Sequence, residues 1–264
     1  MKLLSVALLA LLALPQDKVT FKLNPKKGDK LTKTEKTEMA VKAKIIAGDQ
    51  EQPLEFEQKG LERSTTEVLE VADAAVTKAL LTCHEDVEEK KGPPTMQWEK
   101  SEKPLHGKKI TLSMVDGKLV REGVEGLPEK IVKKLTLSDR TSHIFPKTPV
   151  APGDKWEVTG EDVREFLGAD EDLKDGKIKI KLEAVKDIDG KKCAVMQTAI
   201  EVTGKAEGDI NLTIKLDAEV IVWLDRGYPL SVKGKGTIEM KAENAQFKLS
   251  GQEPMTLDIV TKVE

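Results

Sequence analysis

The residues of this chain best suited to chemistry are two cysteines, three histidines and many carboxylates. Cys83 directly precedes His84, and a thiol beside an imidazole is the pair that a nucleophile or a metal site needs. Adjacent residues of a β-strand point to opposite faces, so we predict that these two side chains do not act together. His106 and His143 stand apart among turn-forming residues, and three scattered histidines give no metal-ligand spacing.

The acidic segment before Gly176 offers oxygen ligands of the kind that calcium prefers, at Asp170, Glu171, Asp172 and Asp175. It lacks the regular spacing and the terminal glutamate of an EF-hand loop, so a solvated loop is predicted. Carboxylate pairs across strands leave no trace in a sequence, and no serine lies in a Gly-x-Ser-x-Gly setting. The sequence therefore predicts no catalytic residue, no cofactor-binding residue and no metal ligand, and a protein that is not an enzyme.

The two cysteines leave two alternatives open. A bridge between Cys83 and Cys193 would close a loop of roughly 110 residues, which the chain-entropy model credits with about 4.7 kcal/mol. Cys83 is also in phase with Ala79, Leu81 and Val87, so a small buried thiol explains it equally well. In both cases we expect inert thiols, because reactive ones need exposure and positive surroundings.

The elements that carry these residues are predicted to be β-strands, and the clearest lies between residues 210 and 224. Apolar residues occupy every second position there: Ile210, Leu212, Ile214, Leu216, Ala218, Val220, Val222 and Leu224. This alternation is typical of an antiparallel strand with one dry and one wet face. Because Ile221 makes the wet face apolar near its end, we expect Trp223 to be buried under a helix or a long loop.

Hairpins organise the rest of the chain. Tight turns are predicted at Asp116-Gly117, Asp175-Gly176 and Asp189-Gly190, because such pairs readily supply positive φ. The first strand is expected at Val19, Phe21 and Leu23. Consecutive hairpins of this kind make a meander.

Two short helices are expected among the strands. One follows a capping box of Thr159 and Asp162, and its apolar face ends at Gly168. That face consists of Val163, Phe166 and Leu167. The other begins with Pro128 as its first helical residue, with Ile131, Val132 and Leu135 on its apolar side.

A repeated motif raises the question of duplication. Gly28-Asp29-Lys30 and Gly153-Asp154-Lys155 each follow a proline-containing turn and open a strand. One hypothesis is an internal duplication into halves of about 16–145 and 146–264. Coincidence between two β-rich segments is the other.

The first residues predict export. Lys2 precedes an uncharged apolar run from Leu3 to Leu14, which has the shape of a secretory signal. The run of about 12 residues is short of the roughly 20 that a membrane-spanning helix needs, so no stable membrane insertion is expected. Residues 1–15 are therefore interpreted as a signal peptide and residues 16–264 as a single β-rich domain; a buried N-terminal strand or helix is the alternative.

The composition excludes some classes of binding partner. The net charge is -3 and its two signs are interleaved, so there is no basic stripe for nucleic acid. Aromatic residues make up 3% of the chain, which argues against the Trp and Tyr platforms of sugar-binding modules. The four candidates for such a platform are Trp98, Trp156, Trp223 and Tyr228.

Three segments carry a resemblance to known proteins: Lys26 to Lys30, Phe145 to Trp156, and Trp223 to Pro229. Together with the signal segment, they resemble an uncharacterised family of exported bacterial β-rich proteins, a domain of unknown function. That family implies no catalytic residues. Long antiparallel strands with short helices are also distantly similar in architecture to half-barrel lipoprotein carriers of the bacterial envelope.

We therefore expect a mainly β protein, an antiparallel meander forming a curved sheet or half-barrel with two short helices. It is expected to be periplasmic or secreted, without catalysis or cofactor. One functional hypothesis is that the curved sheet binds an apolar ligand or lipid-like group. The alternative is a structural or protein-interaction component of the cell envelope with no small-molecule ligand.

Overall fold

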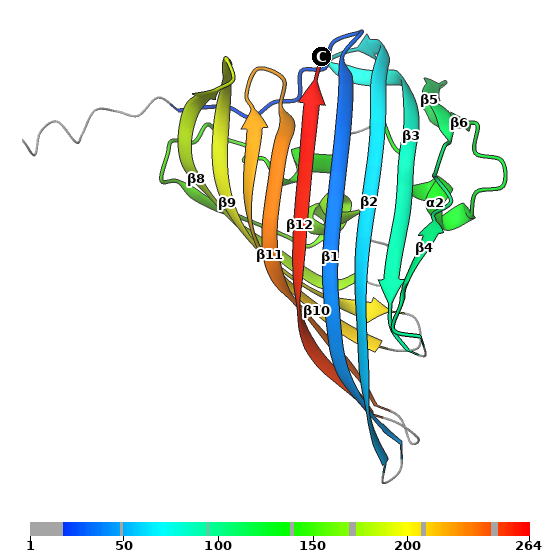
Figure 1. Ribbon diagram of the computed structural model, residues 1–264. Coiled ribbons are helices and arrows are strands. Elements are labelled where there is room, and N and C mark those ends of the chain that lie inside the picture. Colours follow the sequence, from blue (N-terminus) through cyan, green and yellow to red (C-terminus); the bar gives the residue numbers. More distant parts are fainter. Residues whose placement is uncertain are drawn as a thin grey trace, which may run out of the picture.

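The residues that the structure describes form one curved antiparallel sheet of twelve strands (Figure 1). The computed structural model describes residues 18–47, 50–93, 95–137, 140–168, 173–206, 210–243 and 248–264, so the expected signal peptide lies outside the described residues. The strands are β1 Lys30–Ala47, β2 Gln50–Ala72, β3 Ala75–Lys91, β4 Trp98–Glu102, β5 Lys109–Val115, β6 Lys118–Glu122, β7 Lys155–Thr159, β8 Leu173–Ile188, β9 Lys191–Ala206, β10 Ile210–Trp223, β11 Tyr228–Glu243 and β12 Lys248–Val263. The mainly β class and the curved sheet predicted from the sequence are confirmed.

The strand order is β6-β5-β3-β2-β1-β12-β11-β10-β9-β8-β7, with β4 beside β3. The sheet is a meander except at its centre, where the first long strand pairs with the last. Because β6 and β7 end the order, the sheet stays open. All strands before residue 145 lie on one side of the β1–β12 pair and all later ones on the other. This arrangement suits a duplication, which stays a hypothesis.

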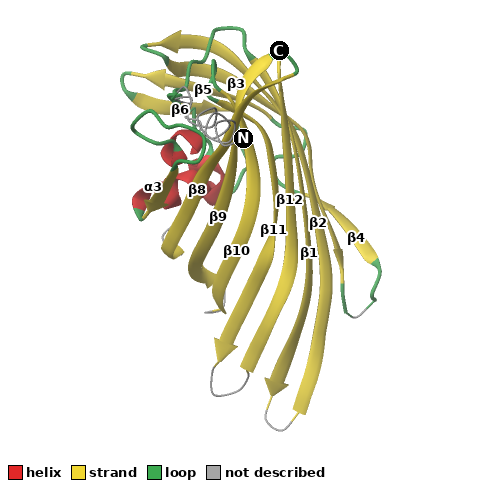
Figure 2. Cartoon of the chain, turned by 90° about the vertical axis from the view of Figure 1, so that its left-hand side faces the viewer, coloured by secondary structure: helices red, strands yellow, loops and turns green. Residues whose placement is uncertain are grey.

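Short helices and loops lie in the hollow of the sheet near one end (Figure 2). They are α2 Glu129–Lys134, the 3-10 helix η1 Arg140–Ile144 and α3 Glu161–Leu167. The face of the sheet that carries them is called the inner face below. Val163 of α3 and Ile144 of η1 are fully buried there, against apolar residues of β7 to β10. A second, smaller cluster joins Leu135, next to α2, to Ile110 and Leu112 of β5.

The expected helix starts are each corrected by one position. Gly160 is the N-cap of α3, with no side-chain cap hydrogen bond, so the capping box of Thr159 and Asp162 is wrong. The Asp162 carboxylate instead lies 3.3 Å from His143 Nδ1 of η1. The expected Gly168 C-cap is confirmed in the left-handed conformation. Pro128 is the N-cap of α2 and not its first helical residue.

Two of the three expected tight turns are confirmed, with positive φ at Asp116-Gly117 and Asp189-Gly190. Asp175-Gly176 is not a turn, because both residues lie inside β8. A side chain at Gly176 would meet Val163 Cγ1 at 2.6 Å, so the glycine makes room for α3 on the sheet. The expected first strand is also wrong: Val19 makes only an isolated bridge to Val150, although Val19 and Phe21 are buried in the core.

The two Gly-Asp-Lys motifs adopt the same local structure. In the first, the Asp29 carboxylate accepts the Lys26 N–H at 2.8 Å, and Gly28 and Asp29 pair through their backbones with Val68 of β2. In the second, the Asp154 carboxylate accepts the Ala151 N–H at 2.8 Å, and the same pairing is made with Leu182 of β8. In both β2 and β8, a β-bulge directly follows the paired residue, Val68 or Leu182.

Candidate functional site

The inner face of β10 changes from covered to open along its length. Val222, Val220, Ala218 and Leu216 are 0%, 6%, 3% and 8% exposed, whereas Ile214 and Leu212 on the same face are only half-buried. The reason is the position of the covering layer, since α3 packs on η1, β7 and β8 at the other end of the hollow. The confirmed apolar face of β10 therefore continues beyond the layer that covers it.

The neighbouring strands extend this open region into a wider surface. Cross-strand pairing places Ile238 and Met240 of β11 opposite Ile214 and Leu212, and Met39 of β1 opposite Met255 of β12. We call a set of eight half-buried apolar residues on the inner face of these strands the apolar strip: Leu212, Ile214, Ile238, Met240, Met255, Leu257, Met39 and Phe56. It crosses five strands, a width of about 20 Å at the usual strand spacing. Glu253 and Gln58 interrupt it.

Two features make the strip adaptable and concave. Met39, Met240 and Met255 have flexible, polarisable side chains, which fill irregular gaps and suit ligands of variable shape. Gly234 and Gly236 lie on the same face of β11, opposite Ala218 and Leu216. A Cβ at Gly234 would meet Leu216 Cδ1 at 2.9 Å, and one at Gly236 would run into the backbone carbonyl of Lys215. Glycine therefore permits the close approach of β10 and β11 in this curved region.

A belt of charged residues borders the strip on β1 and β2. Lys33 Nζ lies 2.7 Å from the Glu35 carboxylate and 3.8 Å from that of Glu62, which also accepts a hydrogen bond from Ser64 Oγ at 3.3 Å. Burial lowers the pKa of Lys33, but the charges of Glu35 and Glu62 outweigh it, so the pKa is raised. Lys33 is thus held as a cation near the polar edge of an apolar surface.

The belt continues onto β3 through Asp86, which is buried. Burial raises its pKa, against the opposing effects of Lys103, the Leu105 backbone N–H and His106. The Asp86 backbone N–H also donates to His106 Nδ1 at 3.2 Å. The inner face thus has an apolar strip that crosses β10 to β2, and a wall of charged residues beside it on β1 to β3.

The cysteines are free and buried, so the disulfide alternative is wrong and the buried thiol is confirmed. Five strands separate β3 from β9, roughly 25 to 30 Å along the sheet, and a bridge needs Cα atoms about 4.4 to 6.8 Å apart. Burial, with the charges of Glu62 and Asp86, raises the pKa of Cys83 from 9.0 to about 11. A bulge after Cys83 puts Val87 on the outer face, so these two residues do not share a face as expected.

The sequence candidates for a nucleophile or metal site, Cys83 and His84, do not form a joint site in the residues that the structure describes. His84 Nε2 lies 2.9 Å from Thr65 Oγ1 on the outer face, opposite to Cys83, as the sequence predicted. No cluster of three or more metal-ligating side chains occurs in the described ranges. The acidic loop from Asp170 to Asp172 lies outside them, and Asp175 accepts the N–H of Gly176 at 2.8 Å.

The four aromatic candidates have different surroundings. Trp156 donates from Nε1 to the Ile144 carbonyl at 2.8 Å and packs against the core, and Tyr228 is buried. Trp98 is exposed. Trp223 is only half-buried on the outer face, where Lys191 Nζ and the Arg226 guanidinium lie 5.0 and 5.5 Å from its ring centre. The expected helix or loop cover over Trp223 is wrong, because the turn after β10 folds Arg226 back over the ring.

The shallow pockets of the described residues do not coincide with the apolar strip. Their lining includes outer-face residues such as Lys179, Ala199 and Asp217, and both are open to solvent. Sequence reasoning anticipated an apolar concavity but named no residue of it, although alternation in β10 to β12 was a usable signal. Among the described residues, no helix is long and apolar enough to cross a membrane.

No protein-family model and no curated protein matches the sequence. Among solved structures, the chain is similar to lipovitellin, from a structure that describes its lipid–protein interactions. The two sequences are 7% identical and the TM-score is 0.34. The match covers 92% of this chain and 26% of the lipovitellin chain. It therefore spans about a quarter of the lipovitellin chain.

Two further structures show weaker likeness. DynF from the dynemicin pathway of Micromonospora chersina has 11% identity and a TM-score of 0.21, with 94% of this chain and 85% of that chain covered. A DUF1329 family protein from Desulfovibrio piger has 9% identity and a TM-score of 0.15, with 90% and 85% covered. Scores this low carry no inference about function.

Proposed function

We propose that the protein is an exported, non-catalytic binding protein that holds an apolar ligand or lipid-like group against the apolar strip. The observation that carries the proposal is the change along β10, from fully buried Val222 to half-buried Leu212 on one apolar face. Water contact with neighbouring half-buried apolar side chains is unfavourable, and contiguous apolar surfaces of this kind mark binding sites. The ligand would complete the cover that α3 and η1 give to the other end.

The chemistry of the apolar strip and of the charged wall indicates an amphiphile. A hydrocarbon part would lie along the methionines of β1, β11 and β12, where adaptable contacts suit chains of different length. A polar end would face Lys33 and the carboxylates around it, which stay hydrogen-bonded or ion-paired without a ligand. The curved sheet therefore supports binding of a molecule with both characters, in the periplasm or outside the cell.

Native mass spectrometry of the purified mature protein, before and after organic extraction, tests the proposal. We expect additional mass before extraction and its loss afterwards, with rebinding of a fluorescent phenylnaphthylamine to the extracted protein. Bare protein mass in both states, and no rebinding, would favour the alternative of a structural or interaction component of the cell envelope.

A matched pair of variants locates the site. Met255→Glu places a charge on the apolar strip, whereas Thr256→Glu places the same charge on the exposed outer face one residue later. We expect the first to weaken probe binding by about tenfold or more, because it buries a carboxylate under the ligand, and the second to leave it unchanged. Equal effects of the two variants would place the probe elsewhere.

A further inference from the structure

The hairpin of β3 and β4 presents two large apolar side chains to solvent, Met96 in its turn and Trp98 at the start of β4. Met96 is 45% exposed and Trp98 is 40% exposed. Single exposed apolar residues are ordinary, but here two of them share one projecting hairpin. We call Gly92, Pro93, Met96 and Trp98 the β3–β4 tip.

The tip is a built turn and holds Met96 in an unusual conformation. The Met96 backbone has φ of 54°, a value that side-chain-bearing residues rarely adopt. Its N–H donates to the Gly92 carbonyl at 2.8 Å, and Thr95 Oγ1 accepts the Gln97 N–H at 3.4 Å. The local hydrogen bonds therefore favour a conformation that leaves an apolar side chain in water, a conflict that needs a reason.

Lysines and carboxylates alternate around the tip, as in the pairs Lys90–Glu88 and Lys91–Glu57, and two of the lysines approach the Trp98 ring. Lys59 Nζ lies 4.5 Å and Lys91 Nζ 5.9 Å from the centre of the Trp98 ring. From residue 90 to 100 the sequence has three lysines and one glutamate, a balance of +2. Lys91 also pairs with Glu57 at 3.1 Å, but an exposed pair of this kind is weak and can exchange partners.

We propose that the β3–β4 tip docks the protein on the surface of an anionic lipid bilayer. Tryptophan is enriched at membrane interfaces because its ring has an apolar body and a polar N–H, and lysines reach from that depth to lipid phosphates. Trp98 with its two lysines has this composition, and Met96 supplies an apolar side chain that enters the headgroup region. Neither a sugar platform nor a protein core contact accounts as well for two lysines beside the ring.

The tip lies at the rim of the apolar strip. A Cβ at Gly92 would meet Phe56 Cβ at 3.1 Å, and Phe56 belongs to the strip. Trp98 is on the outer face of β3 and β4, and Phe56 is on the inner face of β2. Docking through the tip would thus place the edge of the strip at the bilayer surface. The docking proposal goes beyond the ligand-binding proposal and is tested without it.

A flotation assay with the mature protein tests docking. The vesicles consist of phosphatidylcholine mixed with phosphatidylglycerol. We expect the wild type to float with these vesicles, less with pure phosphatidylcholine, and less at high salt, since screening weakens surface electrostatics. The variant Met96→Ser/Trp98→Ala should bind about tenfold more weakly, and Lys59→Gln about fivefold more weakly. Met114→Ser/Val115→Ser, at the similarly exposed end of β5, is the control and should bind as the wild type does.

Three outcomes would overturn docking: no flotation of the wild type, unchanged flotation of the Met96/Trp98 variant, or an equal loss in the control. If the Met96/Trp98 variant does not fold, two other measurements test docking. They are the flotation of Lys59→Gln and the quenching of wild-type tryptophan fluorescence by brominated lipids. Trp98→Phe should remove most of that quenching. Phenylnaphthylamine binding should stay unchanged in all tip variants, so loss of docking and failure of the proposed ligand site are separate results.

Discussion

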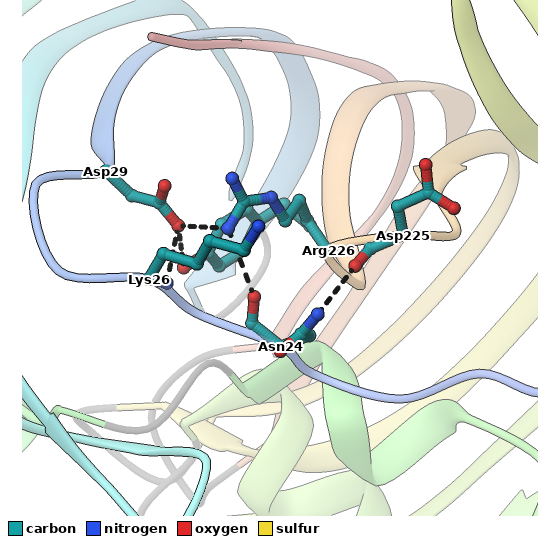
Figure 3. Close-up of polar contacts among 6 residues, drawn as sticks. Asn24, Lys26, Asp29, Asp225 and Arg226 are labelled. Carbon is teal, nitrogen blue, oxygen red and sulfur yellow. Dashed lines mark hydrogen bonds and ion pairs between the residues drawn. The ribbon is translucent and has the colours of Figure 1, made fainter.

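The Arg226 guanidinium lies 3.3 Å from the Asp29 carboxylate, although 197 residues separate them in sequence. Tyr228 Oη also lies within hydrogen-bond distance of this carboxylate, at 3.3 Å, and the Asn24 side chain donates to the Asp225 carbonyl (Figure 3). The contacts fasten the segment before β1 to the turn between β10 and β11. Two of the segments that carry the family resemblance therefore meet in space.

Loss of this buried carboxylate is expected to be costly. Asp29→Ala leaves Arg226, whose side chain is 16% exposed, without its partner, and we expect a loss of about 3 kcal/mol in unfolding free energy. Urea denaturation measures the loss. Lys215→Ala breaks an exposed pair with Glu201 and should cost less than about 1 kcal/mol. A similar small cost at Asp29 would show that the contacts of Asp29 with Arg226 and Tyr228 contribute little to stability.

Cys83 is expected to resist labelling in the folded protein. Because its pKa is raised to about 11, only about one thousandth of the thiol is ionised at pH 8. Labelling by a bulky maleimide should be slow at that pH and fast in denaturant. The raised pKa also contributes stability that is present below about pH 9 and lost as the pH rises toward 11, since the unfolded thiol ionises first. Rapid labelling of the folded protein would contradict the burial.

Substitution by phenylalanine should change the unfolding free energy differently at the two half-buried tryptophans, Trp156 and Trp223. Trp156→Phe removes the hydrogen bond to the Ile144 carbonyl and should cost about 1 kcal/mol or more. Trp223→Phe should be near neutral, because the buried Nε1 of Trp223 has no hydrogen-bond partner among the described residues. Chemical denaturation of both variants checks the contrast, and equal costs would argue against it.

Gly176 sets how closely α3 approaches β8. Gly176→Ala adds a methyl group where Val163 Cγ1 would be 2.6 Å away, and we expect a destabilisation of about 1 to 3 kcal/mol. Val163→Ala in the same chain should recover part of this loss, because the two residues share one space. Additive losses in the double-mutant cycle would place the strain elsewhere.

The sequence alone predicted β10, because alternation of apolar and polar residues is a local consequence of one-sided burial. It also predicted the turns at Asp116-Gly117 and Asp189-Gly190, where the local φ demand selects the residues. The same reasoning failed at Asp175-Gly176, since the glycine there serves a helix packed from another part of the chain. Local patterns do not distinguish those two uses of glycine.

Only the tertiary structure decided which side chains form the candidate sites. The pairing of β1 with β12 brings Met39 beside Met255, and no local pattern specifies that partner. The length of β10 that α3 and η1 leave uncovered determines that Leu212 is open and Val222 is buried, although both belong to one alternating run. Burial depends on what packs from elsewhere in the chain, so the sequence determined the apolar face and the fold determined which part of it stays uncovered.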